Sequence, residues 1–242
     1  MANAKAIAVM GAGDATGGAI ARRFAREGYV ACVARREVEK LAPLVSEIAA
    51  AGGKARAFGV DGREEGQVGA MFDTIEAEIG PVEVAVFNIG ANVPASILDE
   101  TARKYRKIWE LAAYAGFLFG REAAKRMVPR GRGTIIFTGA TASLRGGAGF
   151  AAFAGAKHAL RALAQSMARE LGPKNIHVAH VVIDGAIDTA FIRDTFPERY
   201  AMKAEDGILD PNAIAQTYWA VHTQPRSAWT FEMDLRPWQE KW

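Results

Sequence analysis

The chain has 242 residues, of which 50% are hydrophobic and 24% are charged, and its formal net charge is +3 at pH 7. These values are typical of a globular protein and exclude a disordered or collagen-like chain, while the scattered basic residues give no sign of a nucleic-acid-binding surface. An α/β domain of this length is common, so we expect one domain spanning residues 1–242.

The first 36 residues predict a strand, a tight turn, a helix and a second strand. The apolar run Ala6–Met10 enters the glycine-rich stretch 11–18, an alanine- and arginine-rich helix follows, and a second apolar run covers residues 29–34. Glycines permit positive φ angles and close backbone approach, and the N–H groups at a helix start attract phosphate. The pattern therefore predicts the pyrophosphate-binding half of a dinucleotide fold, with a nicotinamide dinucleotide as ligand. The alternative is a turn with a purely structural role.

Two basic residues end the second strand. Arg35 and Arg36 stand roughly 20 residues past the glycines, where an acidic residue would bind a ribose 2′-hydroxyl and an arginine accommodates a 2′-phosphate. We therefore expect NADP(H) to be preferred over NAD(H). Alternatively, the two arginines are solvated residues that open the next helix.

The rest of the chain alternates between helical and strand patterns. Helices are expected at residues 37–51, 67–79, 99–127, 150–171 and 211–221, and strands at residues 54–60, 82–87, 134–138, 178–183 and 228–235. This alternation predicts a doubly wound, mostly parallel Rossmann-type sheet of about seven strands between two helical layers, the three-layer α/β/α class.

Residues 184–210 have weak periodicity. We interpret them as a mobile substrate loop over the crevice at the carboxyl ends of the strands, where open α/β sheets place their ligands. The helix at 150–171 is dense in alanine, so we expect one face to pack on the sheet and the other on a second subunit, in a homodimer or homotetramer. Packing within its own domain is the alternative.

Location follows from what the sequence lacks. The richest apolar stretch, residues 111–119, is shorter than the roughly 18 residues needed to cross a bilayer, and the N-terminal apolar run is also the first strand rather than a signal peptide. Cys32 is the one cysteine and lies mid-strand, so we expect it to be buried in a protein of a reducing compartment. We expect a cytoplasmic protein with no membrane or nucleic-acid partner.

The order of these motifs resembles the short-chain dehydrogenase/reductase family over nearly the whole chain. The turn from Gly11 to Gly17 is similar to the family's T-G-x-x-x-G-x-G, with Met10 for the threonine and Ala15 for the middle glycine. Residues 87–90 resemble its N-N-A-G, and residues 184–189 resemble its P-G-x-x-x-T with an aspartate for the proline.

The resemblance implies a largely intact cofactor site. Asp61 stands where the family contacts adenine, residues 87–90 beside the adenosine half, and residues 184–189 near the carboxamide. The residues expected to bind the cofactor are Gly11, Gly13, Thr16, Gly17, Arg35, Arg36, Asp61, Asn88, Gly90, Lys157, Gly185, Ile187 and Thr189.

The resemblance breaks at the residues that carry the chemistry. The family uses a tyrosine as general acid/base, a lysine four residues on, a serine that binds the substrate oxygen and a helix asparagine. Here Lys157 is present, whereas Phe153, Ala140 and Ala112 stand at the tyrosine, serine and asparagine positions. Phenylalanine has no proton to give, and a general acid typically contributes about 10²–10⁴-fold.

Another residue would have to supply the proton. Thr141 follows the fifth strand and Asp188 lies on the loop near the expected nicotinamide, so these two are the first candidates for replacing the tyrosine. Further candidates are Tyr114, Ser143, Asp184 and His158, and for each of the six residues a structural or solvated role is the alternative.

No metal site is expected. His177 and His180 are three apart on a strand and face opposite sides, and His222 near a helix end is expected at the surface. The tryptophans at 219, 229, 238 and 242 would line either an apolar substrate pocket or a subunit interface.

The leading hypothesis is an NADP(H)-dependent oxidoreductase that acts on a carbonyl, alcohol or activated alkene with a degenerate catalytic tetrad. The alternative is a catalytically silent NADP(H)-binding protein that serves as a sensor or partner subunit.

Overall fold

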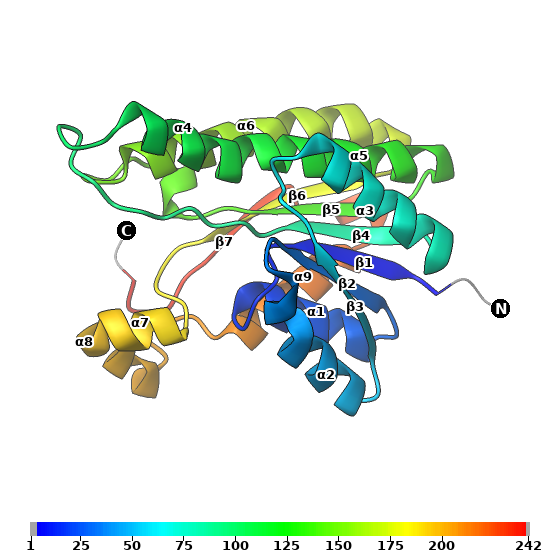
Figure 1. Cartoon of the computed structure of the whole chain (residues 1–242), viewed down its shortest axis with the longest axis horizontal. Helices are drawn as coiled ribbons and strands as arrows, with labels where there is room; N and C mark the ends of the chain where they lie inside the picture. Colours follow the sequence, from blue (N-terminus) through cyan, green and yellow to red (C-terminus); the bar gives the residue numbers. More distant parts are fainter. Residues whose placement is uncertain (1–3, 241–242) are drawn as a thin grey trace.

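The computed structural model describes residues 4–240, and its centre is a seven-stranded parallel sheet. The strand order is β3-β2-β1-β4-β5-β6-β7, so the order reverses between β1 and β4 (Figure 1). The strands are β1 Ala6–Met10, β2 Val30–Arg35, β3 Lys54–Gly59, β4 Val82–Phe87, β5 Thr134–Thr138, β6 His177–Ile183 and β7 Glu232–Leu235. The doubly wound α/β prediction is confirmed.

Helices cover both faces of the sheet, and Figure 1 shows the two layers above and below it. One layer holds α3 Glu65–Glu78, α4 Ala102–Trp109, α5 Ala115–Met127 and α6 Ala151–Leu171. The other holds α1 Thr16–Arg26, α2 Ala42–Ala50 and α9 Pro211–His222.

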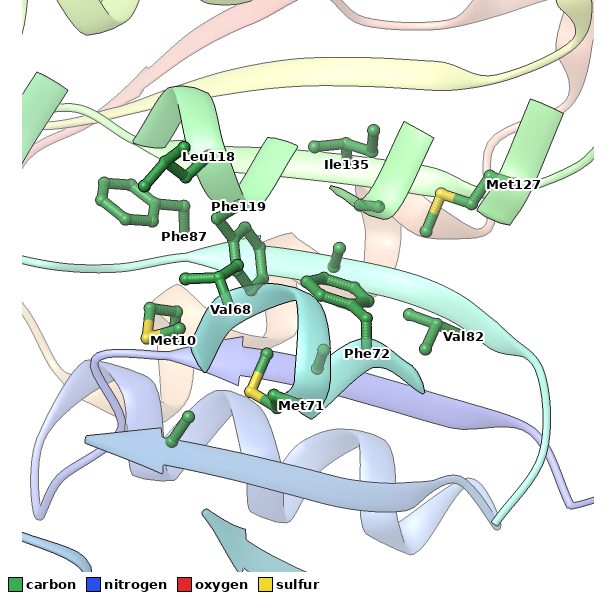
Figure 2. Packing of buried hydrophobic residues seen from close by; sticks show 14 of the residues in the cluster. Met10, Val68, Met71, Phe72, Val82, Phe87, Leu118, Phe119, Met127 and Ile135 are labelled. Carbon is green, nitrogen blue, oxygen red and sulfur yellow. The ribbon is translucent and has the colours of Figure 1, made fainter. Parts of the chain in front are cut away.

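Side chains of β1 alternate between two hydrophobic cores, because successive residues of a strand point to opposite faces. Met10 packs into the core that contains Phe72 of α3 and Phe119 of α5, as Figure 2 shows. Ile7 and Val9 pack on the opposite face with residues of α1, α2 and α9. Every residue of β1 is fully buried, which explains its continuous apolar run.

The long helix expected at 99–127 is interrupted. It starts at Ala102, after Thr101 accepts a hydrogen bond from the Lys104 N–H, and a π-helical turn at Glu110–Tyr114 separates α4 from α5. The extra residue of a π turn changes which side chains face the sheet, and apolar spacing does not reveal it.

The segment 184–210 is more ordered in structure than an irregular loop. It contains α7 Ala190–Thr195, α8 Pro197–Ala201 and a 3₁₀ turn at Met202–Glu205, and a parallel bridge joins Ile187 to Leu209. Helices of one or two turns are too short for helical periodicity to show in the sequence, so the sequence analysis did not predict these elements within the expected substrate loop.

Two smaller predictions also differ from the structure. The last strand covers only Glu232–Leu235 and not residues 228–235, and a 3₁₀ turn at Arg226–Ala228 precedes it. His222 is part-buried rather than a surface residue, since its ring bonds to the Tyr29 hydroxyl at 2.8 Å and the Thr134 hydroxyl at 2.9 Å.

Candidate functional site

A cavity of about 740 Å³ opens at the carboxyl ends of β1, β4, β5 and β6. Its walls come from the turn between β1 and α1, the segments that follow the other three strands, and the first turns of α6. This is the position where open parallel sheets bind ligands, beside the reversal of strand order.

A second hollow of about 320 Å³ adjoins the first toward β2 and β3. The two share Gly11, Gly13, Asp14 and residues 88–90. Together they form a two-part groove with the glycine turn in the middle, which is the shape that a dinucleotide requires.

The glycines of this turn are fixed by close backbone packing. Gly11 has φ 87°, and a Cβ on it would lie 2.7 Å from the Asn88 carbonyl oxygen. A Cβ on Gly17 would lie 2.6 Å from the Gly11 carbonyl oxygen. The same oxygen accepts a hydrogen bond from the Asn88 side-chain amide at 3.1 Å. Gly13 differs, because its nearest neighbour would be an Arg35 guanidinium nitrogen at 3.9 Å, so this glycine leaves open space on the groove side.

The start of α1 fits a phosphate group. Its N-cap, Ala15, has no side-chain hydrogen bond to offer the first turn, and that turn holds no acidic residue. The Thr16 hydroxyl lies on the cavity wall, buried, and has no hydrogen-bond partner among the described residues. Free N–H groups, the helix dipole and an unpaired buried hydroxyl together form a site for an anion.

Arg35 and Arg36 both line the second hollow, as does Asp61. Within residues 4–240 neither arginine forms an ion pair, although Asp14, Glu37 and Asp61 line the same hollow. Asp61 is held by Arg63 at 2.5 Å, and this hydrogen-bonded guanidinium lowers the pKa of the carboxyl. The hollow therefore offers two guanidinium groups to a phosphate.

Lys157 is the buried cation of the larger cavity. Its side chain extends from α6 and is 3% exposed, and its Nζ donates to the Thr138 carbonyl at 2.9 Å and the Ile89 carbonyl at 3.2 Å. Burial lowers the pKa of this ammonium group to about 8. A group with that pKa exchanges protons readily near neutral pH.

Two of the three replaced positions line the cavity, namely Ala140 and Phe153. Ala112 is fully buried in the π turn and packs in one cluster with Phe153. The residues present at these positions offer the cavity no polar side chain.

Thr141 lines the cavity, but its only hydroxyl proton is already used. The hydroxyl donates to the Asp184 carboxylate, which also pairs with Arg236 at 3.3 Å. Thr141 can therefore accept a hydrogen bond from a ligand without being able to donate one in this arrangement.

Asp188 is not part of the cavity lining and pairs with the Lys203 ammonium at 2.7 Å.

Only part of the loop expected near the carboxamide lines the cavity. Gly185 and Ile187 line the cavity, whereas the Thr189 hydroxyl caps α7 by accepting from the Ile192 N–H at 3.1 Å.

The other proton-donor candidates also have structural roles. Tyr114 is the last residue of the π turn, but its ring stacks on Trp109, with 6.3 Å between the ring centres, and does not line the cavity. His158 bonds to the Ala154 carbonyl one turn back, and the Ser143 hydroxyl accepts from the Ala140 N–H. None of them faces the substrate space.

His177 and His180 bind different partners. His177 stacks on Trp229 and bonds to the Thr230 carbonyl, while His180 bonds to Glu232 at 2.9 Å. Burial lowers the pKa of His180 to about 4, so it is neutral at pH 7. A search of residues 4–240 finds no cluster of three His, Cys, Asp or Glu side chains suited to a metal ion.

None of the tryptophans within residues 4–240 lines the cavity. Trp219 packs edge-on against Phe24, and Trp238 is 74% exposed and donates its indole N–H to the Glu205 carbonyl. Neither they nor Trp229 line the cavity, and Trp242 lies outside the described residues.

Sequence reasoning missed four polar residues of the cavity wall, namely Asp14, Asn92, Thr138 and Arg145. Arg145 stands in the glycine-rich segment between β5 and α6, and a basic residue amid glycines beside a predicted active-site strand was the available signal.

Within the described part of the chain, no helix combines the length and apolar character that a bilayer crossing requires.

Comparison with known proteins gives a consistent picture. The sequence profile of the family described as short chain dehydrogenase matches residues 5–199. A crystal structure of a short-chain dehydrogenase from Rhodopseudomonas palustris shares 51% identity, with 98% of this chain and 100% of that chain covered and a TM-score of 0.84.

Two further relatives have a named substrate or a bound cofactor. The 3-oxoacyl-[acyl-carrier-protein] reductase MabA of Mycobacterium tuberculosis is 30% identical over 191 residues, which cover 78% of this chain and 72% of that protein. A metagenomic short-chain oxidoreductase crystallised with NADP is 25% identical, with a TM-score of 0.79 and 97% of both chains covered.

Proposed function

Because this chain belongs to the short-chain dehydrogenase family, we propose that it is an oxidoreductase that moves hydride between NADP(H) and a carbonyl, alcohol or activated alkene. The observation that carries the proposal is the buried ammonium of Lys157 inside a cavity that continues into an anion-binding groove. A purely structural protein has no need of either feature.

The residues that would hold the cofactor lie along the groove. The glycine turn and the start of α1, with the unpaired Thr16 hydroxyl, would hold the pyrophosphate. Arg35 and Arg36 would bind the 2′-phosphate, and Asp61 lies beside them for the adenine. Asn88 and Gly90 line both hollows, and Gly185 and Ile187 the larger one.

Lys157 would have two tasks. When bound, a nicotinamide group supplies or accepts a hydride, and the substrate must gain or lose one proton to match. Lys157 would bind ribose hydroxyls and also be the source of that proton, directly or through a water, because the other candidate donors are engaged elsewhere.

The missing serine and tyrosine hydroxyls affect which class of substrate the site favours. Ala140 and Phe153 offer no hydroxyl to an alkoxide that develops on a reduced ketone, and such a donor is worth a few kcal/mol, about 2.7–4 in well-studied sites. An activated alkene depends less on that donor, since a proton can reach carbon from Lys157 or water after hydride addition. We therefore rank activated alkenes first.

A second candidate function rests on the same replacements. Phe153, Ala140 and Ala112 together would leave a protein that binds NADP(H) without turnover, as a sensor or partner subunit. The distinguishing experiment follows NADPH oxidation across a panel of enones, ketones and aldehydes, alongside a direct NADPH titration. Binding with NADPH consumption above the Lys157→Met background supports the enzyme, and binding without it supports the silent protein.

We also propose a cytoplasmic homodimer or homotetramer. Tyr105, Trp109 and Phe117 on α4 and α5 are each about 40% exposed, which leaves aromatic surface for a second subunit to cover. Light scattering of the purified protein tests this, and a monomer at all concentrations would contradict it.

A further inference from the structure

The substrate end of the cavity carries one charged group that the proposed hydride chemistry does not use. Arg145 lines this end together with Ala140, Ala142, Phe150 and Phe153. The other charged lining residues are Asp14, in the glycine turn shared with the second hollow, and Lys157, which donates to two carbonyls.

The backbone of Arg145 is held by a hydrogen-bonded turn. Its N–H donates to the Thr141 carbonyl at 3.1 Å, and the Ser143 N–H donates to the Ala140 carbonyl at 2.7 Å. The Ser143 side chain is fully buried beneath this turn, and Thr141 is tied to Asp184. This turn fixes the backbone position from which the exposed Arg145 side chain extends.

The surroundings leave this charge available. No ion pair to Arg145 is found in residues 4–240, and the nearby acid Asp184 is already engaged by Thr141 and Arg236. Gly146 and Gly147 line the cavity next to Arg145 and leave room beside it. Guanidinium groups bind carboxylates through two parallel N–H···O bonds, which a neutral amide cannot match.

We propose that the substrate is an anion, with an apolar body against Phe150 and Phe153 and a carboxylate that binds Arg145. This inference rests on the proposed oxidoreductase function, since it names the class of substrate for that site. It makes Arg145 a specificity-determining residue, and it places the reacting carbon of the substrate between the carboxylate and Lys157.

The test compares matched ligands by calorimetry, with no turnover required. Phenylpropanoate and phenylbutanoate are titrated against their primary amides, both on the protein alone and on the protein saturated with NADPH. We expect the carboxylates to bind at least about 10-fold more tightly than the amides, as a charge-assisted hydrogen bond predicts.

Variants assign the discrimination to one residue. Arg145→Gln should bring the ratio of carboxylate to amide affinity close to one. Arg145→Lys should keep part of the preference for carboxylates, because lysine keeps the positive charge but lacks the two parallel N–H donors of the guanidinium. Arg226→Gln is the matched control, since Arg226 is an exposed arginine before β7, at the opposite end of that strand from the cavity. It should leave the ratio unchanged.

The outcomes separate this inference from the proposed function. The inference is overturned if wild-type protein binds carboxylates no better than amides, if neither class binds at millimolar levels, or if Arg145→Gln keeps the discrimination. It is also overturned if Arg145→Gln lowers the affinity for NADPH as strongly as the affinity for the carboxylates, because Arg145 would then bind the cofactor rather than the substrate. Failure of NADPH to bind any variant would refute the proposed function alone, because the carboxylate titrations on the protein alone still report on Arg145.

Discussion

The Lys157 ammonium lies 5.8 Å from the centre of the Phe153 ring, one turn back on α6. A tyrosine at position 153 would carry a hydroxyl on the far edge of that ring, whereas phenylalanine gives the ammonium only the π face of an aromatic ring. Lys157 is buried and donates to two carbonyl groups, while the tyrosine hydroxyl that it would activate is absent. In the proposed mechanism the proton therefore comes from Lys157.

Restoring the missing hydroxyls should restore carbonyl chemistry. The double variant Phe153→Tyr with Ala140→Ser is expected to raise the rate of ketone reduction by about tenfold or more, because it supplies a general acid and an oxyanion donor. The rate of NADPH oxidation with a ketone measures this. Adding Lys157→Met to the double variant is the control and should remove the gain. An unchanged rate in a double variant that still binds NADPH would show that the pocket has diverged.

The pH dependence of turnover should report on Lys157. Its pKa is lowered to about 8 by burial, so the proton-bearing form that reduction requires disappears above that pH. We expect kcat for reduction to be flat near neutral pH and to fall above about pH 8. A profile that stays flat to pH 10 would exclude the lysine as the proton source.

Stability should change with pH in the same range with a known sign. The folded pKa of Lys157 lies below the ordinary value of 10.5, so between about pH 8 and 10.5 the unfolded chain binds more protons at this group than the folded one. The contribution of Lys157 to the free energy of unfolding should therefore rise with pH through this window. Urea unfolding of wild type and Lys157→Met at pH 8 and pH 10 checks this. The free energy of unfolding of the wild type minus that of the variant should increase between the two pH values, and a difference that stays constant or decreases contradicts the prediction.

The unpaired hydroxyl of Thr16 gives a prediction of opposite effects on stability and binding. Thr16→Val should stabilise the free protein by about 1 kcal/mol, because a buried hydroxyl without a partner is costly, and should weaken NADPH binding. Thr134→Val is the matched control, since the Thr134 hydroxyl is equally buried but bonded to His222. That variant should lose stability and keep NADPH affinity. Unchanged NADPH affinity in Thr16→Val would exclude the hydroxyl as a phosphate ligand.

The choice of cofactor should depend on the pair of arginines in the second hollow. Arg36→Ala is expected to weaken NADPH by about tenfold or more while leaving NADH nearly unchanged, because only NADPH carries the 2′-phosphate. Fluorescence titration with both cofactors measures the ratio, with Arg226→Ala as the control. Equal losses for NADPH and NADH would count against the phosphate assignment.

The sequence was informative wherever local spacing determines structure. The alternating elements predicted the parallel sheet, and the groove follows from glycines whose close contacts, such as Gly17 against Gly11, demand the absence of a side chain. Lys157 and position 153 were singled out through the resemblance to the family, and both line one cavity.

It failed where a side chain's partner comes from a distant segment. Thr141 and Asp188 were reasonable proton donors by position, but Asp184 engages the first and Lys203 the second, and neither pairing leaves a signal in local spacing. The same holds for His222, whose partners are Tyr29, just before β2, and Thr134, the first residue of β5. The π turn at Glu110–Tyr114 shifts the helix register without any compositional sign.

The most direct test of the account is a calorimetric titration of the purified protein with NADPH and, separately, with NADH. The groove around Gly13, Thr16 and Arg36 predicts saturable binding of one NADPH per chain, with NADH bound about tenfold more weakly or worse. Absence of binding by both cofactors at millimolar levels would contradict the account.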